Sequence, residues 1–190
     1  MKYKPTIQGY KWITATTSNN GNGGLNDQEA FKSAVAMLEV AIDEWHSPRL
    51  VHLILTGATA HQYDSFIKRV KRDLAGIKYS YKGCTESASN RGGLHQHFMF
   101  VHDADDSTAS PFDDGNDSSA LSRATTATQR MAPDFKVTVA QPYSHDTPYM
   151  PLTSYTLQNA ACWQSYIFKQ RSKQPDHRYL SSRAASRTCH

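Results

Sequence analysis

The chain has 190 residues, of which 38% are hydrophobic and 20% are charged, and its formal net charge is +4. This size and composition favour one domain with a single core and some unpacked segments. No apolar run is long enough to cross a membrane, and the first residues lack a signal-peptide pattern, so we expect an intracellular protein. The three widely spaced cysteines fit neither a disulfide framework nor a zinc knuckle.

The first 49 residues are predicted to add a strand and a helix to the same domain. Residues 9–16 are rich in aromatic and β-branched side chains, which is typical of a strand. A loop rich in Asn and Gly follows it. Asn26 or Asp27 is then expected to cap a helix that ends before Pro48, because apolar residues recur there at helical spacing.

Residues 50–171 form the predicted core of the domain, with alternating strand and helix patterns. Strands are predicted at 50–56, 77–86, 94–101 and 135–140, and helices at 59–74, 118–131 and 152–171. The order of the first six elements is that of a ferredoxin-like, split β-α-β sheet. We therefore expect an α+β fold whose antiparallel sheet is covered by helices on one side. The strand at 94–101 would be central in that sheet, and the last helix would be C-terminal.

Two charged segments lie outside these elements. The Asp-rich stretch 102–117 is predicted to be a mobile acidic insert, and residues 172–190 form a basic tail. Clustered cations favour binding to a nucleic-acid backbone, although a solvated surface is the alternative. The candidate DNA contacts are Lys68, Arg69, Lys71 and Arg72 in the second helix, with Arg171 and Lys173 near the tail.

The strand at 94–101 carries two histidines with the spacing of metal ligands. His95 and His97 are two positions apart, so their side chains point to the same face of the strand. Two imidazoles on one face of a rigid strand are half of a metal site. The same alternation places Phe98 and Phe100 on the opposite face, where we expect them in the core.

A hard divalent cation also requires a carboxylate ligand. Glu86 ends the preceding predicted strand, nine residues before His95. In a hairpin the two positions can face each other across the ladder, so Glu86 is the candidate third ligand. His102 and Asp103 are alternatives just past the strand, but His102 has the wrong parity and is expected to point to the other face.

The last predicted helix offers a candidate nucleophile. Tyr155, Tyr166 and Lys169 are expected on one stripe of this helix, with Tyr166 and Lys169 one turn apart. A phenol with a pKa of about 10 is a poor nucleophile at neutral pH. A metal that polarises the electrophile and a neighbouring ammonium group would make the attack feasible. Tyr155 lacks a lysine three residues on and is not predicted to be a second nucleophile.

Three motifs occur in a fixed order: a strand ending in Leu55-Thr56, the His95-Gln96-His97 strand, and the helix with Tyr166-Ile167-Phe168-Lys169. This set resembles the HUH endonuclease superfamily, specifically the single-tyrosine rolling-circle replication initiators of phages, plasmids and small single-stranded DNA viruses. The resemblance implies that Tyr166 attacks a DNA phosphate with assistance from Lys169. It also implies that His95, His97 and Glu86 bind one Mn²⁺ or Mg²⁺ ion.

The resemblance further implies a biological role. The protein would nick single-stranded DNA at a replication origin through a covalent 5′-phosphotyrosine intermediate and would later rejoin strands. No helicase P-loop follows the motifs, so a separate helicase and the host replication machinery are expected partners, in a prokaryotic cytoplasm rather than a eukaryotic nucleus. Two alternatives are a transposase or relaxase of the same superfamily, and a non-catalytic ferredoxin-like module that binds single-stranded nucleic acid.

Overall fold

The computed structural model describes residues 3–7, 10–13, 28–88, 93–104, 110–113, 115–142, 145–168 and 180–181. The elements in chain order are β1 (Tyr3–Ile7), β2 (Tyr10–Ile13), α1 (Gln28–Glu44), β3 (Pro48–Thr56), α2 (Ala60–Asp73), β4 (Tyr79–Ala88), β5 (Gly93–Asp103), α3 (Ala120–Gln129), β6 (Lys136–Ala140), β7 (Met150–Pro151), α4 (Leu157–Gln164), the 3₁₀ helix η1 (Ser165–Phe168) and β8 (Leu180–Ser181). Among these described segments, no helix has the length and apolar character that crossing a membrane requires.

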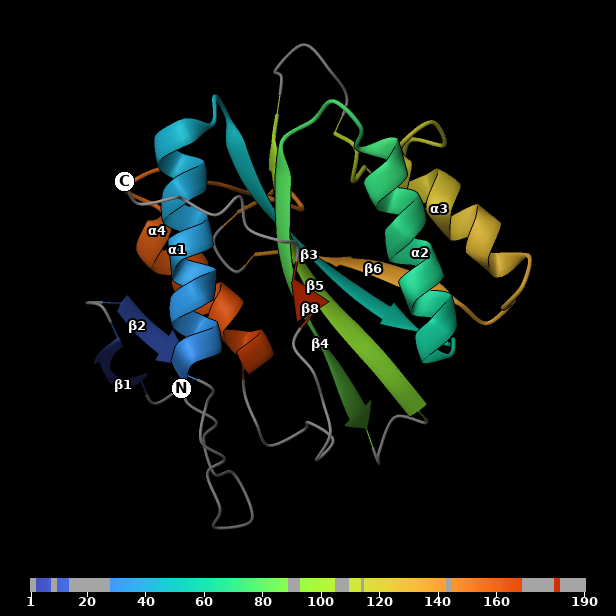
Figure 1. The fold of residues 1–190 in the computed structure, drawn as a ribbon, viewed down its shortest axis with the longest axis horizontal. Coiled ribbons are helices and arrows are strands. Elements are labelled where there is room, and N and C mark those ends of the chain that lie inside the picture. The colour runs from blue at the N-terminus through green and yellow to red at the C-terminus, as the bar shows by residue number, and fades with distance from the viewer. Residues whose placement is uncertain are drawn as a thin grey trace, which may run out of the picture.

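An antiparallel sheet forms the centre of the molecule (Figure 1). Its strand order is β6-β3-β5-β4-β8, and the short β7 also pairs with β3. All neighbouring strands in it are antiparallel. The strands β1 and β2 pair with each other in a separate two-stranded sheet. The α+β class is therefore confirmed, and β5, which carries the histidine pair, lies in the middle of the main sheet.

Helices cover both faces of this sheet, so the prediction of helices on one side is wrong (Figure 1). The helices α1 and α4, with η1, pack on one face, and α2 and α3 pack on the other. The reason lies in β3, where Leu50 belongs to the first core cluster and its neighbour Val51 to the second. Because successive strand residues point to opposite faces, a strand that is apolar on both faces needs cover on both.

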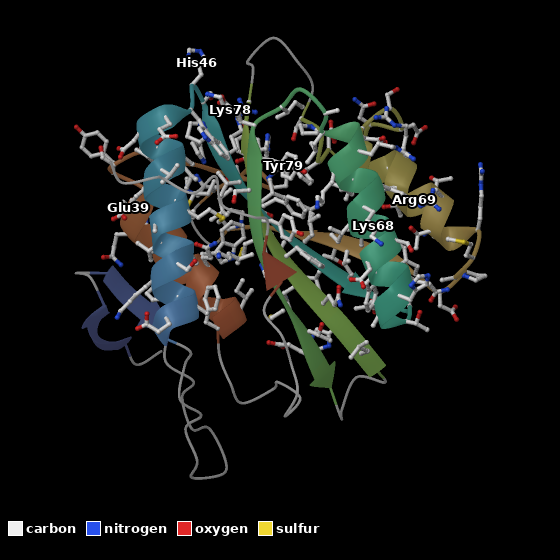
Figure 2. The ribbon with its side chains drawn as sticks, in the orientation of Figure 1. Glu39, His46, Lys68, Arg69, Lys78 and Tyr79 are labelled. Carbon is white, nitrogen blue, oxygen red and sulfur yellow. The ribbon has the colours of Figure 1, made fainter. Side chains whose placement is uncertain are left out.

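The helix α2 has a clear start and an amphipathic pattern. The Thr59 side chain accepts a hydrogen bond from the backbone of Gln62, and the Gln62 side chain accepts one from the Thr59 backbone, which completes a capping box. Figure 2 shows Lys68 and Arg69 on this helix; Lys68 is exposed and Arg69 is half-buried. The cationic residues therefore lie on α2, on the side of the sheet that α2 and α3 cover.

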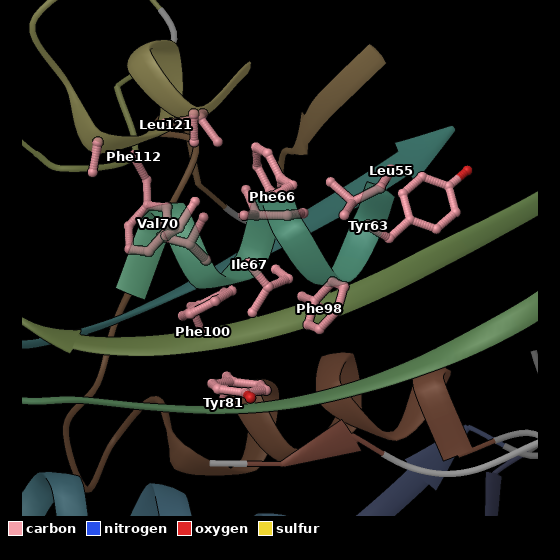
Figure 3. Packing of buried hydrophobic residues seen from close by; sticks show 14 of the residues in the cluster. Leu55, Tyr63, Phe66, Ile67, Val70, Tyr81, Phe98, Phe100, Phe112 and Leu121 are labelled. Carbon is pink, nitrogen blue, oxygen red and sulfur yellow. The ribbon is translucent and has the colours of Figure 1, made fainter. Parts of the chain in front are cut away.

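Aromatic side chains fill the space between α2 and the sheet (Figure 3). Phe98 and Phe100 of β5 are 1% and 0% exposed, and Phe66 of α2 is also fully buried in this cluster. Their burial confirms the expectation that both β5 phenylalanines belong to the core. It also leaves neither ring available as a stacking platform for bases, which a non-catalytic nucleic-acid-binding sheet would use.

The last predicted helix differs most from the structure. It was expected over 152–171, but α4 begins only at Leu157 and continues as η1 to Phe168. The preceding turn is held by the Thr156 hydroxyl, which donates to the carbonyl of Pro151 at 2.6 Å. Tyr155 lies in this turn with 94% of its surface exposed, so it does not share a helical stripe with Tyr166 as expected.

Part of the segment predicted to be a mobile acidic insert is packed against the rest of the molecule. The Asp103 carboxylate accepts hydrogen bonds from the backbone N–H groups of His46 and Ser47 at 3.2 and 2.8 Å. Phe112 is 2% exposed and lies against aromatic rings of β5. These two residues therefore do not belong to a freely solvated loop. The rest of the predicted insert, 105–109 and Asp114, lies outside the described residues. So do the predicted cap residues Asn26 and Asp27 and most of the basic tail, 172–179 and 182–190.

Candidate metal centre

The candidate centre lies on the β4–β5 ladder, on the face that α1 and α4 cover. In the register of this ladder Glu86 lies directly opposite His95, and His97 faces Cys84 two positions further along. His95 and His97 share a face because they are two residues apart on one strand. The prediction that Glu86 faces His95 across a hairpin is therefore confirmed.

The three side chains approach one another closely. The Oε2 atom of Glu86 lies 3.3 Å from Nε2 of His95 and 3.6 Å from Nε2 of His97. One ligand atom from each residue can be chosen so that all three lie within 4.8 Å of one another. Glu86 and His97 are almost fully buried, whereas the His95 side chain is 18% exposed. The group is therefore accessible from solvent on the His95 side.

This donor set fits a divalent metal ion. One carboxylate oxygen and two imidazole nitrogens are ligands that Mn²⁺ and related ions accept, and the carboxylate supplies the negative charge that a hard cation needs. Three protein ligands also leave coordination positions for water or substrate. The chemistry of the residues thus agrees with the predicted site, while the identity of the ion stays a prediction.

A third histidine reaches the centre from β3, and the sequence patterns did not single it out as part of the site. This residue is His52. Its Nε2 atom lies 3.0 Å from Nδ1 of His97, and both rings are buried. The signal was present: a histidine at an alternate position of a buried strand, in a topology that places that strand beside the one with the pair. A polar residue in such a strand needs a partner.

The His52 ring is buried and uncharged. Desolvation by burial and, to a smaller extent, the nearby His97 lower the pKa of His52 to about 3, and Glu86 opposes this shift. The Trp163 ring of α4 lies edge-on to the His52 ring at a centroid distance of 5.7 Å. His52 is therefore neutral at ordinary pH, with one nitrogen that donates and one that accepts.

The segment with the predicted nucleophile packs on this same face. Ile167 and Phe168 of η1 are fully buried in the core cluster of this face, and η1 contacts β4, the strand that carries Glu86. The backbone of Tyr166 is part of this helical turn. The side chain of Tyr166 and the whole of Lys169 lie outside the described residues, so their predicted roles stay predictions.

The competing ligands for the centre are placed elsewhere. His102 is fully buried on the opposite face of β5, with its ring 5.1 Å from the ring of Phe112. Desolvation lowers its pKa to about 4. This confirms the prediction that His102 faces away from the histidine pair. Asp103 is engaged by the backbone that precedes β3, as described above.

The predicted DNA-contacting cations are separated from the centre by the sheet. The exposed surface of α2 has a shallow depression lined by Ser65, Lys68, Arg69 and Arg72. The Nζ atom of Lys71 lies 5.7 Å from the centre of the Tyr81 ring. Arg171 and Lys173 fall outside the part of the chain that the structure describes. The α2 cations therefore cannot touch a phosphate bound at Glu86, His95 and His97.

Comparison of the chain with known proteins finds no matching family model, no matching curated protein and no matching solved structure. The functional interpretation below therefore rests on the chemistry and placement of the side chains described here.

Proposed function

We propose that this protein is a metal-dependent endonuclease and strand-transferase of the HUH type, which nicks single-stranded DNA at a replication origin to start rolling-circle replication. The observation that carries the proposal is the convergence of Glu86, His95 and His97 on the central strands. The turn that contains Tyr166 packs on the same face of the sheet. A phosphotyrosine nickase needs ligands for a Lewis acid and an oxygen nucleophile, and in this proposal the Tyr166 hydroxyl is that nucleophile.

The topology supports a ferredoxin-like core for this enzyme. The strand order β6-β3-β5-β4 places the first and third strands of the β-α-β-β-α-β unit side by side, as a split β-α-β repeat does. The helices α2 and α3 of that unit lie together on one face. In this interpretation α1, α4 and η1 are additions to that unit, and they cover the face of the sheet that carries the site.

In the proposed cleavage reaction the metal ligands and the tyrosine have separate roles. His95, His97 and Glu86 would hold one Mn²⁺ or Mg²⁺ ion, which when bound would polarise a phosphate oxygen of the DNA. The Tyr166 hydroxyl attacks the phosphorus, so that an O–P bond to tyrosine forms while the bond to the 3′ oxygen breaks. The 5′ phosphate then stays on the protein, and the 3′-hydroxyl is free to prime synthesis.

Lys169 lies three residues after Tyr166 in the sequence. Its ammonium group would favour the ionised phenol, which is the reactive form. Rejoining is the reverse reaction: a 3′-hydroxyl attacks the phosphotyrosine, and the tyrosine leaves. The same residues therefore account for both cleavage and strand transfer.

The proposed partners follow from this role. Single-stranded origin DNA is the substrate, and a separate helicase with the host replication machinery, in a prokaryotic cytoplasm, would extend the free 3′ end. The α2 cations, on the far side of the sheet from the metal centre, suit a flanking stretch of nucleic acid rather than the scissile phosphate.

A covalent-adduct assay tests this function. The protein is incubated with Mn²⁺ and single-stranded oligonucleotides tiled across the replicon that encodes it. We expect one oligonucleotide to give a protein–DNA species that survives denaturation, and a chelator to prevent its formation. Oligonucleotide binding without any adduct would contradict the proposal and would favour the non-catalytic module. The proposed nickase requires the adduct to be lost in the Tyr166→Phe variant.

A further inference from the structure

We infer that His52 is a positioning residue for the proposed metal site: it holds the His97 ring in the orientation and tautomer in which Nε2 can bind the ion. This inference rests on the metal centre of the proposed function. His52 is not a ligand in it, because its Nε2 atom is directed at Nδ1 of His97, at 3.0 Å.

The geometry assigns a different task to each nitrogen of His97. Nε2 lies on the side of Glu86, 3.6 Å from its Oε2 atom, and Nδ1 lies on the side of His52. Only Nε2 is therefore available as a ligand together with Glu86 and His95. A neutral imidazole that binds a metal through Nε2 carries its proton on Nδ1. That proton is buried, so it needs an acceptor.

His52 supplies this acceptor from an adjacent strand. In the ladder between β3 and β5 His52 lies opposite Met99, and His97 lies opposite Ile54, so the two histidines meet diagonally. The contact is thus set by the pairing of two central strands. A metal-bound histidine usually donates its second N–H group to an outer partner, and loss of such partners typically weakens metal binding 10- to 100-fold.

A histidine suits this task better than a fixed acceptor. When no ion is bound, the Nε2 proton of His97 can point to the Glu86 carboxylate, and His52 then donates to Nδ1. When Nε2 is engaged, the roles reverse and His52 accepts. The hydrogen bond between the two rings is kept in both states, so ion binding does not leave Nδ1 of His97 unsatisfied.

The packing of the His52 ring supports a positioning role. Its ring is 4% exposed and lies between the ring of His97, at 5.2 Å, and the ring of Trp163, at 5.7 Å. Trp163 belongs to α4, the helix that continues into the turn with Tyr166. One chain of ring contacts therefore connects the ligand strand β5, the strand β3 and the helix that precedes the proposed nucleophile.

The test compares Mn²⁺ binding by calorimetry in the full chain and in three variants. His52→Phe keeps a ring against Trp163 but removes both nitrogens, and we expect a 10- to 100-fold weaker Mn²⁺ affinity. His52→Gln places an amide near the position of Nε2, which can donate or accept, and we expect affinity within about threefold of the original chain. His102→Phe, a change of a buried histidine on the other face of β5, is the matched control and should leave the affinity unchanged.

A second measurement reads the tautomer directly. In the Mg²⁺-loaded protein, ¹⁵N spectra of the histidine side chains should show the proton of His97 on Nδ1 in the original chain and in His52→Gln. In the original chain the proton of His52 should lie on its own Nδ1 when Mg²⁺ is bound, so that its Nε2 accepts from Nδ1 of His97. Because the reading in the original chain does not depend on any variant, it holds even if His52→Phe does not fold.

The outcomes separate this inference from the proposed function. Equal Mn²⁺ affinity of His52→Phe and the original chain, or His52 protonated on Nε2 with Mg²⁺ bound, would overturn the inference. So would a His52→Gln variant as weak as His52→Phe. If the original chain binds no Mn²⁺ at all, the proposed metal centre itself is contradicted. If the expected pattern of affinities occurs without a covalent DNA adduct, the positioning role stands and the nickase proposal fails.

Discussion

The two faces of strand β5 each bury a histidine, and the two residues have opposite surroundings. His97 lies against His52, His95 and Glu86. His102, five positions along the same strand, lies against the ring of Phe112 in the aromatic cluster. Both rings are nearly inaccessible to solvent. Burial and residue type are thus the same, and only the neighbouring side chains distinguish a candidate ligand from a core residue.

The covering elements differ in the same way. The helices α1 and α4 bring Trp163 and the turn of Tyr166 to the face with Glu86 and His97. The helix α2 brings Phe66 to the other face, and its cations lie outside the core. One face therefore combines a candidate metal-binding donor set with the backbone turn that contains Tyr166, and the other combines an aromatic core with a cationic exterior. The predictions that follow test this division, from the largest expected effect to the smallest.

The largest effect is expected for Tyr166→Phe, which removes only the hydroxyl that the proposed chemistry needs. The denaturation-resistant protein–DNA adduct should disappear, while DNA binding and thermal stability stay close to those of the original chain. Tyr155→Phe is the matched control, because Tyr155 is exposed in the turn before α4, and it should form the adduct normally. The reverse pattern would assign the nucleophile to the wrong tyrosine.

Next in size is the effect of His97→Ala, which we expect to slow single-turnover cleavage by orders of magnitude because the ion would be lost or misplaced. His95→Ala should act in the same way. His102→Phe should cleave at nearly the original rate, since the ring lies on the other face. A similar loss of cleavage in the His97 and His102 variants would break the distinction between the two faces.

Removal of the carboxylate should have a smaller effect than removal of an imidazole. We expect Glu86→Ala to reduce cleavage about 10- to 100-fold, and the loss should shrink when Mn²⁺ is raised, since a water can take the vacant position. The control is Glu39→Ala, which removes a carboxylate on α1 instead of the one on β4 (Figure 2). This change should not alter the cleavage rate at any Mn²⁺ concentration. Cleavage that is insensitive to the Glu86 change would exclude this residue as a ligand.

The buried His102 on the aromatic face should make the folded protein less stable in acid. Burial lowers the pKa of His102 to about 4, so below the unfolded value of about 6.5 the unfolded chain takes up a proton that the folded chain does not. Stability therefore falls as the pH is lowered between these two values, by about 2 kcal/mol from this residue between pH 7 and pH 5. Urea unfolding at both pH values should show a smaller loss in His102→Phe. An identical loss would mean that His102 does not titrate in this way.

The smallest effect is expected on the exterior of α2. Replacement of Lys68, Arg69 and Arg72 by Gln should flatten the dependence of log K on log salt for single-stranded DNA by about 0.7 for each phosphate that is no longer neutralised. Cleavage at saturating DNA should not change, because the sheet separates these residues from Glu86 and His97. Lys78→Gln, at the opposite end of the β4 region from Glu86 (Figure 2), is the control. An unchanged salt slope would make the α2 cations ordinary solvated surface.

Local patterns in the chain were enough for much of the fold and for most of the candidate centre. The alternation of side chains along a strand correctly assigned His95 and His97 to one face and His102 to the other. Hairpin geometry correctly brought Glu86 opposite His95. Helical periodicity located α2 to within a residue of its observed bounds. Each of these features depends on neighbours in the sequence, which is why they could be predicted.

What depends on distant contacts was missed or mistaken. His52 joins the centre only because β3 pairs with β5, a strand more than 40 residues away in the chain. The second helical layer was not predicted, because the apolar run 50–56 indicates a strand that is buried on both faces but does not indicate which elements cover each face. Phe112 lies in a polar segment whose composition suggested no packing. Strand pairing and burial are properties of the whole chain, and no local pattern encodes which surfaces will meet.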